Sequence, residues 1–136
     1  MAEVDIKVTE HFDEAQEKMS LAIRQCLEEL GQSAVEFTQR LTPVVTGRLR
    51  NSMTYVTKYT IGENTYHDKD GRAFDGSLSV KADSGEVYFG TNVEYAMYVE
   101  NGRKGKNGRH MIKQAAEGHR AYYKATIEKY LASALK

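Results

Sequence analysis

The chain has 136 residues, of which 40% are hydrophobic and 28% charged, and its formal net charge at pH 7 is zero. This length and composition predict a single domain, residues 1–136, that can bury its own core. No apolar run reaches the roughly 20 residues that span a membrane, and Met1–Asp5 lacks the pattern of a signal peptide. We therefore expect a soluble protein made in a cytoplasm. The single Cys26 excludes an internal disulfide, so we expect a buried thiol and a reducing compartment.

The first predicted element is a long amphipathic helix. Residues 1–9 alternate weakly in hydropathy and are expected to be a frayed arm or a short strand. From about Glu10 to Leu41 apolar residues recur at steps of three and four, which predicts a helix that ends before Pro43. Such a helix is about 48 Å long, whereas a compact domain of this size is about 37 Å across, so we expect either that Gly31 breaks or bends it or that it lies against a neighbouring subunit. The apolar positions are Phe12, Ala15, Met19, Ile23, Cys26, Leu27, Leu30, Ala34, Phe37 and Leu41.

Residues 42–52 are predicted to form a connector after this helix. Thr46 is a good N-cap for one short helical turn, and Gly47 allows a tight passage of the backbone. We expect this segment to fix how the chain turns from the first helix into a sheet.

A small sheet follows the connector. Residues 52–61 are rich in β-branched and aromatic side chains and predict a strand. Alternating hydropathy at 78–82 and 86–90 predicts two more strands, which the turn at 83–85 joins into a hairpin. Residues 62–76 are polar and are expected to be a mobile loop.

Helices are predicted again in the last third of the chain. Residues 94–100 predict a short helix, 102–109 a mobile basic loop and 110–135 a final helix. The fold class is therefore α+β, with a long N-terminal helix, a small mostly antiparallel sheet of three to four strands, a short helix, and a C-terminal helix packed on the sheet. The apolar face of the final helix is expected to hold Ile112, Ala115, Ala116, Tyr122, Tyr123, Ile127, Tyr130, Leu131 and Leu135.

Charge is distributed unevenly along the chain. Residues 1–41 hold nine acidic and four basic side chains, residues 42–102 hold eight and six, and residues 103–136 hold two and nine. Either the acidic first helix packs beside the basic last helix within one subunit, or opposite charges meet between neighbouring subunits. The nine tyrosines leave a similar choice between interface positions and half-buried strand positions.

Candidate metal, nucleotide and catalytic motifs fail on their spacing. A calcium loop with Gly71 at its sixth position would place Tyr66 first and Ser77 twelfth, where carboxylates are needed. The glycines of the basic loop lack the Walker spacing, the four histidines have no metal-ligand spacing with the cysteine, and no nucleophile elbow occurs. We expect no enzyme activity, no metal and no cofactor.

The basic loop has two interpretations. Its cations would suit contacts with nucleic-acid phosphates, or they form a solvated loop without a ligand. No aromatic residue is interleaved with them for base stacking, so sequence-specific readout is poorly supported. The alternative function is accordingly a small nucleic-acid-binding module that uses the basic C-terminal segment. The loop cations are Arg103, Lys104, Lys106 and Arg109.

Two segments are more distinctive than the rest of the chain. Pro43–Ser52 reads Pro-Val-Val-Thr-Gly-Arg-Leu-Arg-Asn-Ser, and Val93–Gly102 reads Val-Glu-Tyr-Ala-Met-Tyr-Val-Glu-Asn-Gly. In this order and spacing they resemble the phage head–tail connector family, the small neck, tail-completion or minor tail proteins of long-tailed bacteriophages. The resemblance covers roughly residues 10–135. Where family members often carry a proline-rich stretch, this chain has Asn107–Ile112, so we expect a more mobile loop there.

The resemblance implies a structural virion protein of a phage or prophage. Its subunits are expected to form an oligomeric ring at the head–tail junction after assembly in the host bacterial cytoplasm. The expected partners are further copies of the chain, the portal and tail proteins, and, without sequence preference, DNA in the channel. No membrane partner is expected. The residues expected to serve as structural motif or interface are Pro43, Thr46, Gly47, Arg48, Leu49, Arg50, Ser52, Tyr95, Tyr98, Glu100 and Gly102.

Specific contacts are expected within these motifs. Arg48 and Arg50 are expected to anchor the connector turn through carboxylates, for which Glu94 and Glu100 are the plausible partners. The two tyrosines of the second motif are expected to pack the short helix onto the sheet. These roles are structural first and belong to an interface second.

Overall fold

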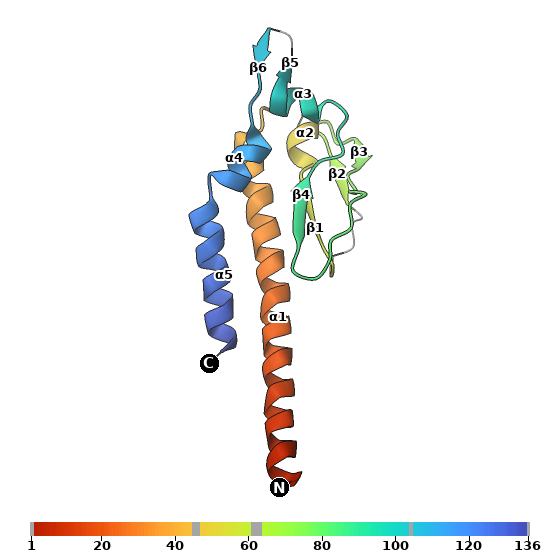
Figure 1. Cartoon of the computed structure of the whole chain (residues 1–136). Coiled ribbons are helices and arrows are strands. Elements are labelled where there is room, and N and C mark those ends of the chain that lie inside the picture. The colour runs from red at the N-terminus through yellow and green to blue at the C-terminus, as the bar shows by residue number, and fades with distance from the viewer. Residues whose placement is uncertain (1, 45–46, 61–63, 104, 136) are drawn as a thin grey trace.

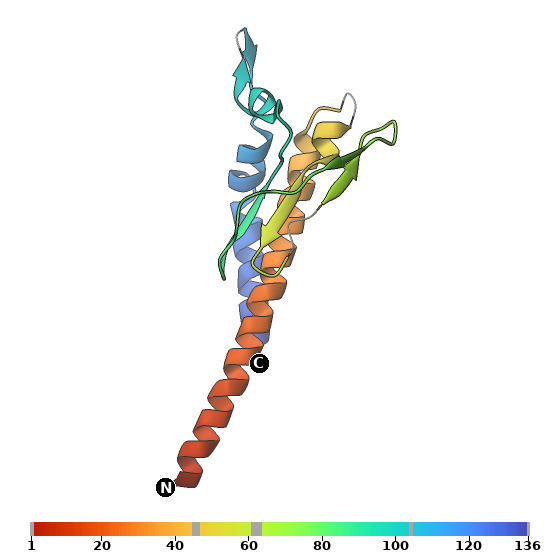
Figure 2. The same ribbon diagram turned by 90° about the vertical axis from the view of Figure 1, so that its right-hand side faces the viewer.

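The structure is a computed structural model that describes residues 2–44, 47–60, 64–103 and 105–135, with side chains described from residue 13 onward. Its dominant element is helix α1, Ala2–Leu41, which runs along most of the length of the molecule, while α3 and the β5–β6 hairpin extend past its C-terminal end (Figure 1). Forty residues at 1.5 Å each make this helix about 60 Å long. The elements that follow cover only part of it, and its N-terminal turns extend beyond them (Figures 1 and 2).

Helix α1 is continuous, which differs from the sequence prediction in two ways. It begins at Ala2, so residues 2–9 are part of the helix and the predicted short strand there is wrong. It also passes through Gly31 without a break. The Tyr55 ring occupies the space beside Gly31, where an added Cβ would lie 2.4 Å from Tyr55 Cδ2. This glycine therefore admits an aromatic ring to the helix surface instead of ending the helix.

The strands among the described residues form three two-stranded antiparallel sheets. The first sheet pairs β1 with β4 in the register Thr54↔Gly90 to Thr57↔Val87, and it lies against α1. The second pairs β2 with β3, and the third pairs β5 with β6. The strand bounds are β1 Thr54–Thr57, β2 Thr65–His67, β3 Ala73–Asp75, β4 Val87–Gly90, β5 Gly102–Arg103 and β6 Lys106–Asn107.

These pairings confirm the α+β class and the antiparallel arrangement but correct two predictions. Part of the expected loop at 62–76 is the β2–β3 hairpin, because the Tyr66 and Phe74 rings stack with centroids 5.4 Å apart and bury Tyr66. Residues 78–82 form no strand, and β1 rather than this segment pairs with β4. The hydropathy of this segment alternates, but none of the described strands pairs with it, and Val80 is 39% exposed.

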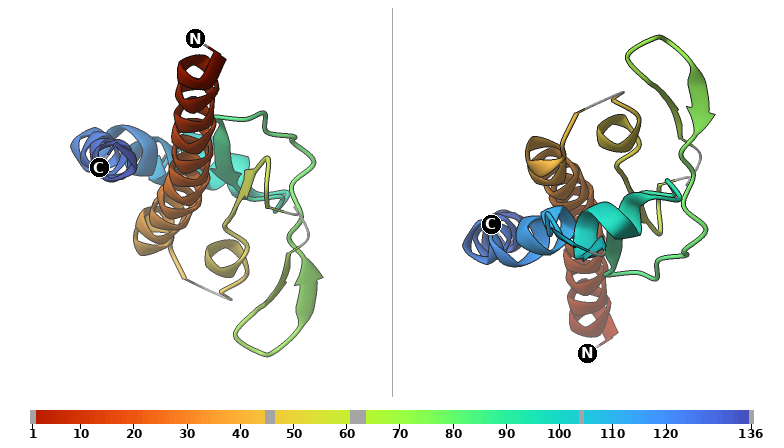
Figure 3. Two further views of the ribbon diagram at one scale, coloured as in Figure 1. Left: turned by 90° about the horizontal axis from the view of Figure 1, so that it is seen from below. Right: turned by 90° about the horizontal axis from the view of Figure 1, so that it is seen from above.

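Four shorter helices complete the described chain: α2 Arg48–Asn51, α3 Ala96–Asn101, α4 Met111–Glu117 and α5 Arg120–Ala134. The predicted final helix is therefore two helices. The chain leaves helical geometry at His119, whose ring stacks on Phe37 of α1 at a centroid distance of 3.6 Å. Helix α5 packs along α1, on a different side from the β1–β4 sheet, so it does not lie on the sheet (Figure 3).

The packing of α5 on α1 brings the acidic and basic parts of the chain together within one subunit. Lys129 Nζ of α5 lies 3.6 Å from Glu29 Oε2 of α1. Cys26 is buried beside them, as expected, and this burial, helped by the charge of Glu29, raises the pKa of the thiol. Contact between opposite charges of different subunits stays a prediction.

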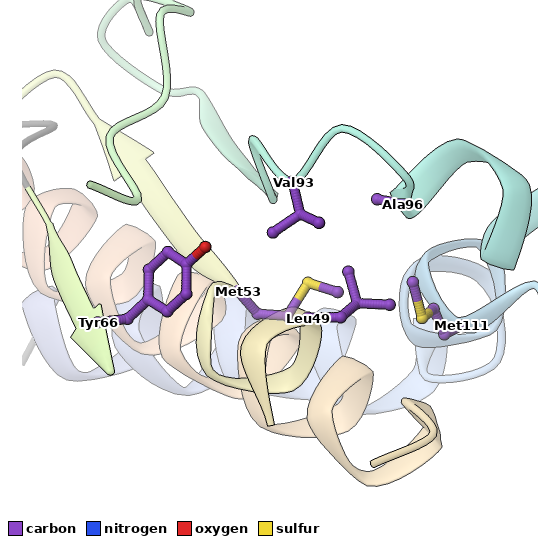
Figure 4. Packing of buried hydrophobic residues seen from close by; sticks show 6 residues of the cluster. All are labelled: Leu49, Met53, Tyr66, Val93, Ala96 and Met111. Atoms are coloured by element: carbon purple, nitrogen blue, oxygen red, sulfur yellow. The ribbon is translucent and has the colours of Figure 1, made fainter. Parts of the chain in front are cut away.

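The main hydrophobic core lies among α2, α3 and α4, at the end of the molecule opposite the N-terminus (Figure 1), and its side chains are shown in Figure 4. Helix α2, strand β2, helix α3 and helix α4 each contribute at least one side chain to it, and short connecting segments contribute the others. This packing joins segments that are far apart in the sequence. The buried core residues are Leu49, Met53, Tyr66, Val93, Ala96 and Met111.

Candidate interaction surface

The two distinctive segments lie against each other above this core. Residues 47–53, which include α2, face residues 93–100, which include most of α3 (Figures 1 and 4). Leu49 from the first segment and Val93 from the second are both buried in the shared core. We call this contact between residues 47–53 and 93–100 the motif junction.

A two-point ion pair closes the motif junction. Arg48 Nη1 donates a hydrogen bond to Glu94 Oε1, and Arg48 Nη2 donates one to Glu94 Oε2, both at 2.9 Å. Glu94 is one of the two carboxylates predicted as partners of Arg48. The Arg48 guanidinium also lies 4.7 Å from the centroid of the Phe74 ring. The hydrogen bonds from Arg48 lower the pKa of the Glu94 carboxyl. A planar guanidinium suits this combination of a two-point hydrogen bond and a ring contact, which a lysine would not reproduce.

The conformation of residues 47–53 is determined by the backbone of Gly47 and by hydrogen bonds of Asn51 and Ser52. Gly47 has φ 80° directly before α2, a left-handed conformation that favours glycine. Ser52 is fully buried, and its Oγ donates to the Leu49 carbonyl oxygen at 2.6 Å. Asn51 Nδ2 donates to the His67 carbonyl oxygen at 2.8 Å and so ties α2 to β2. Thr46 lies outside the described residues, and the N-cap position of α2 is held by Gly47 rather than by the predicted Thr46.

Two of the predicted contacts are wrong. Arg50 is exposed and forms no ion pair within the part of the chain that the structure describes; instead its carbonyl oxygen accepts a 3.1 Å hydrogen bond from Gln39 Nε2. Tyr98 is 55% exposed, and Arg103 Cζ lies 5.1 Å from the centroid of its ring. Tyr98 therefore does not pack α3 onto a sheet. Tyr95 does pack against the core.

Glu100 pairs with backbone amides rather than with an arginine. Its Oε1 accepts from the Ile112 N–H at 2.8 Å, and its Oε2 accepts from the Lys113 N–H at 3.0 Å. Both amides belong to the first turn of α4, where unpaired N–H groups and the helix dipole favour a negative charge. Since Glu100 lies 12 residues before Ile112, whose amide it accepts, no local capping signal in the sequence could have revealed it.

The predicted basic loop is a hairpin with a closely packed base. Strands β5 and β6 pair Gly102 with Asn107, and Arg109 N–H donates to the Val99 carbonyl oxygen at 2.7 Å. Gly102 has φ 85°, and an added Cβ would lie 2.6 Å from the Gly108 nitrogen. Two glycines thus let the two arms of the hairpin meet, and the hairpin projects from the motif end of the molecule (Figure 1).

The hairpin carries exposed cations beside a cleft of about 290 Å³. Arg103, Lys106 and Arg109 are exposed, whereas Lys104 lies outside the described residues. The cleft is also lined by Pro43 and Tyr98. Its aromatic and cationic lining suits an anionic or amphipathic partner, and the ring of Tyr98 stands beside Arg103 although the sequence showed no aromatic residue within the loop.

A second carboxylate that sequence reasoning missed lies on α1. Glu28 accepts hydrogen bonds from Tyr55 Oη at 2.6 Å, from Thr57 Oγ1 at 3.1 Å and from Thr60 Oγ1. Partial burial opposes ionisation, but the three hydrogen bonds outweigh it, so the pKa of Glu28 is lowered. The group fastens the β1–β4 sheet to α1.

The described residues contain neither a cluster of metal ligands nor a membrane-spanning helix. Among them, no three His, Cys, Asp or Glu side chains are gathered so that they would hold a metal ion. None of the described helices combines the length and apolar character of a membrane span.

Comparison with known proteins identifies a family for most of the chain. The family model described as "Bacteriophage HK97-gp10, putative tail-component" matches residues 6–102. The matched range includes all but the first four residues of α1 and both segments of the motif junction, and it ends before α4 and α5. The chain matches no curated protein and no solved structure.

Proposed function

Because the chain belongs to the family of Bacteriophage HK97-gp10, putative tail-component, we propose that it forms an oligomeric ring at the head–tail junction of a phage or prophage virion. A tail component is a structural part of the phage particle, and the role assigns no reaction to the chain. The proposal adds the position at the neck, the ring, assembly in the host cytoplasm and contact with portal and tail proteins.

The exposed apolar surface near the motif junction carries the proposal. Met97 is 71% exposed, Tyr98 55% and Val44 54%. Such side chains on α3 and the connector are costly to leave in water and are typical of surfaces that a partner covers. The motif junction beneath them is linked by the shared core and by the Arg48–Glu94 pair.

The mass of the assembly tests the ring. We expect light scattering and native mass spectrometry, over a range of concentrations, to detect a closed set of identical subunits, either alone or with the portal and tail proteins of the same genome. Met97→Glu is expected to weaken assembly, while Lys81→Glu, at an exposed site distant in the sequence, serves as the control. A chain that stays monomeric under all these conditions would contradict the proposal.

A second candidate function, contact with DNA, is favoured by the exposed cations of the β5–β6 hairpin. A plot of log affinity against log salt concentration has a negative slope, and each phosphate contact that is lost reduces the magnitude of this slope by about 1. We expect Arg103→Ala and Lys106→Ala to weaken binding of double-stranded DNA of any sequence and to reduce this slope, whereas Lys81→Ala leaves both unchanged. Absence of DNA binding at low salt would eliminate this function.

A further inference from the structure

Two surfaces of the helical part have no neighbouring element in the described structure. The first is the overhang, residues 2–18 of α1, which extends past the end of α5 (Figures 1 and 2). Lys18 marks its limit, because Lys18 lines a groove together with Ser133 and Ala134 at the end of α5. The second is the outer face of α5, the side turned away from α1.

The contacts of α5 identify its two faces. The inner face meets α1 through Tyr122, whose Oη lies 3.1 Å from Ser33 Oγ, and through Thr126, which is 6% exposed. The outer face carries Ile127, Leu131 and Leu135, which recur every four residues and so share one side of the helix. They are 41%, 36% and 76% exposed, respectively, which corrects the prediction that they belong to the packed face.

Charge distinguishes the overhang from the outer face of α5. Residues 2–18 contain six acidic and two basic side chains. Two basic side chains of α5, Arg120 and Lys124, are exposed and precede Ile127 at the steps that place them on its outer side. The third, Lys129, pairs with Glu29 on the inner side. The two surfaces are therefore complementary in sign.

The lengths of the two surfaces also match. The overhang of 17 residues is about 26 Å long and α5, with 15 residues, about 22 Å. The apolar spacing of α1 continues into the overhang at Ala15, which is exposed, and at Met19, which is half-buried beside its end. Because α1 is one continuous helix that carries the overhang away from its own α5, the two surfaces cannot meet within one subunit.

We propose that the overhang of one subunit packs on the outer face of α5 in a second copy of this chain. The contact joins two different surfaces, so each copy gives one overhang and receives one, and the series closes into a ring when the rotation between copies permits it. This inference rests on the proposed function, since it names the contact that would build the ring.

Charge reversal in full-length protein tests the contact. One variant carries Asp13→Lys and Glu17→Lys in the overhang, and the other carries Arg120→Glu and Lys124→Glu on α5. All four side chains are exposed, so folding should be preserved, and circular dichroism checks it. Light scattering should show each variant alone assembling at least about tenfold more weakly than the unchanged chain, because like charges now face each other.

An equal mixture of the two variants is expected to regain assembly, because every contact between unlike copies again pairs opposite charges. The control is Lys58→Glu with Lys81→Glu, two exposed lysines outside both surfaces, which should leave assembly unchanged. If the mixture fails to recover, the overhang docks elsewhere, for example on another phage protein, and the inference is overturned.

The same series separates this inference from the proposed function. If the unchanged chain forms a ring and both variants do so equally well, the ring stands and this contact is wrong. If the unchanged chain never assembles, alone or with portal and tail proteins, both proposals fail together.

Discussion

The motif end and the helical end of this molecule bury their apolar groups to different degrees. At the motif end, Met111 is fully buried and the Arg48–Glu94 pair closes the surface above the core. At the helical end, Leu135 is 76% exposed and the overhang of α1 has no neighbouring element within the described chain (Figure 1). The motif end thus has a closed core beneath the exposed side chains of α3, whereas the helical end leaves apolar side chains of α5 and the overhang uncovered by the described chain.

This difference follows from the lengths of the elements. Helix α1 has 40 residues, but α5 has only 15 and strands β1 and β4 have four each, so the chain cannot cover the whole helix. Substitutions in the buried core of the motif end should therefore change the stability of the subunit, whereas those at exposed side chains of the helical end should change association with little effect on folding.

The largest effect is expected where backbone meets backbone at the base of the hairpin. Gly102→Ala places a Cβ 2.6 Å from the Lys106 oxygen at φ 85°, and we expect it to lower the free energy of unfolding by about 4 kcal/mol. Gly105→Ala is the matched control, because its φ of 82° is similar but nothing lies within 4 Å of an added Cβ. Urea unfolding should show a cost of only about 1 kcal/mol there. Equal losses at both glycines would show that the close contact does not matter.

The second-largest loss of stability is expected in the hydrophobic core. Met111→Ala removes a fully buried side chain and leaves a cavity, so we expect a loss of about 3 kcal/mol in the free energy of unfolding. Met97→Ala makes the same chemical change at a site that is 71% exposed, and its effect on stability should stay within about 0.5 kcal/mol. Thermal denaturation of the two variants compares them directly, and similar melting temperatures would refute the proposed position of the core.

Removing the N-terminal cap of α4 is expected to cost less stability than removing a core side chain. Glu100→Ala removes the carboxylate that accepts from the Ile112 and Lys113 amides and is expected to cost about 1 kcal/mol. Glu117→Ala, at the exposed C-terminal end of the same helix, removes the same charge without removing a cap. Hydrogen exchange should speed up at the first amides of α4 only in the Glu100 variant. Unchanged exchange there would contradict the capping role.

Glu28 should make stability depend on pH. Its pKa is lower in the folded state than in the unfolded state, so the stability it contributes is present above the unfolded value of about 4.3 and is lost as the pH falls through the lower folded value. Glu28→Gln should lower stability by a fraction of 1 kcal/mol near neutral pH, because the site is partly exposed. Urea midpoints measured from pH 7 down to about pH 3 should fall more steeply for the unchanged chain; parallel curves would contradict this role.

The smallest effect on folding is expected at the outer face of α5. Ile127→Ala shortens a side chain that is 41% exposed, and the free energy of unfolding of the isolated subunit should change by less than about 0.5 kcal/mol. The same variant should assemble less well if this face is covered by another copy. A large loss of stability in the monomer would show that the outer face is already packed within the subunit.

Local patterns in the sequence were sufficient for several features. The apolar spacing that ends at Leu41 predicts α1, since one face of a helix is read from successive residues of one segment. The motifs also located the connector turn and the short helix, and they reduced the partners of Arg48 to two carboxylates, one of which is Glu94.

Only tertiary contacts decided the rest. Tyr66 stacks on Phe74 and makes a hairpin of a polar segment, and His119 stacks on Phe37 and divides the last helix. Helix α5 has apolar residues on two sides, and its sequence alone does not say which side meets α1. The position of α1 buries Thr126 and leaves Leu131 exposed. Periodicity shows which residues share a face, but burial depends on which distant segment packs there, and that information is absent from any single stretch of sequence.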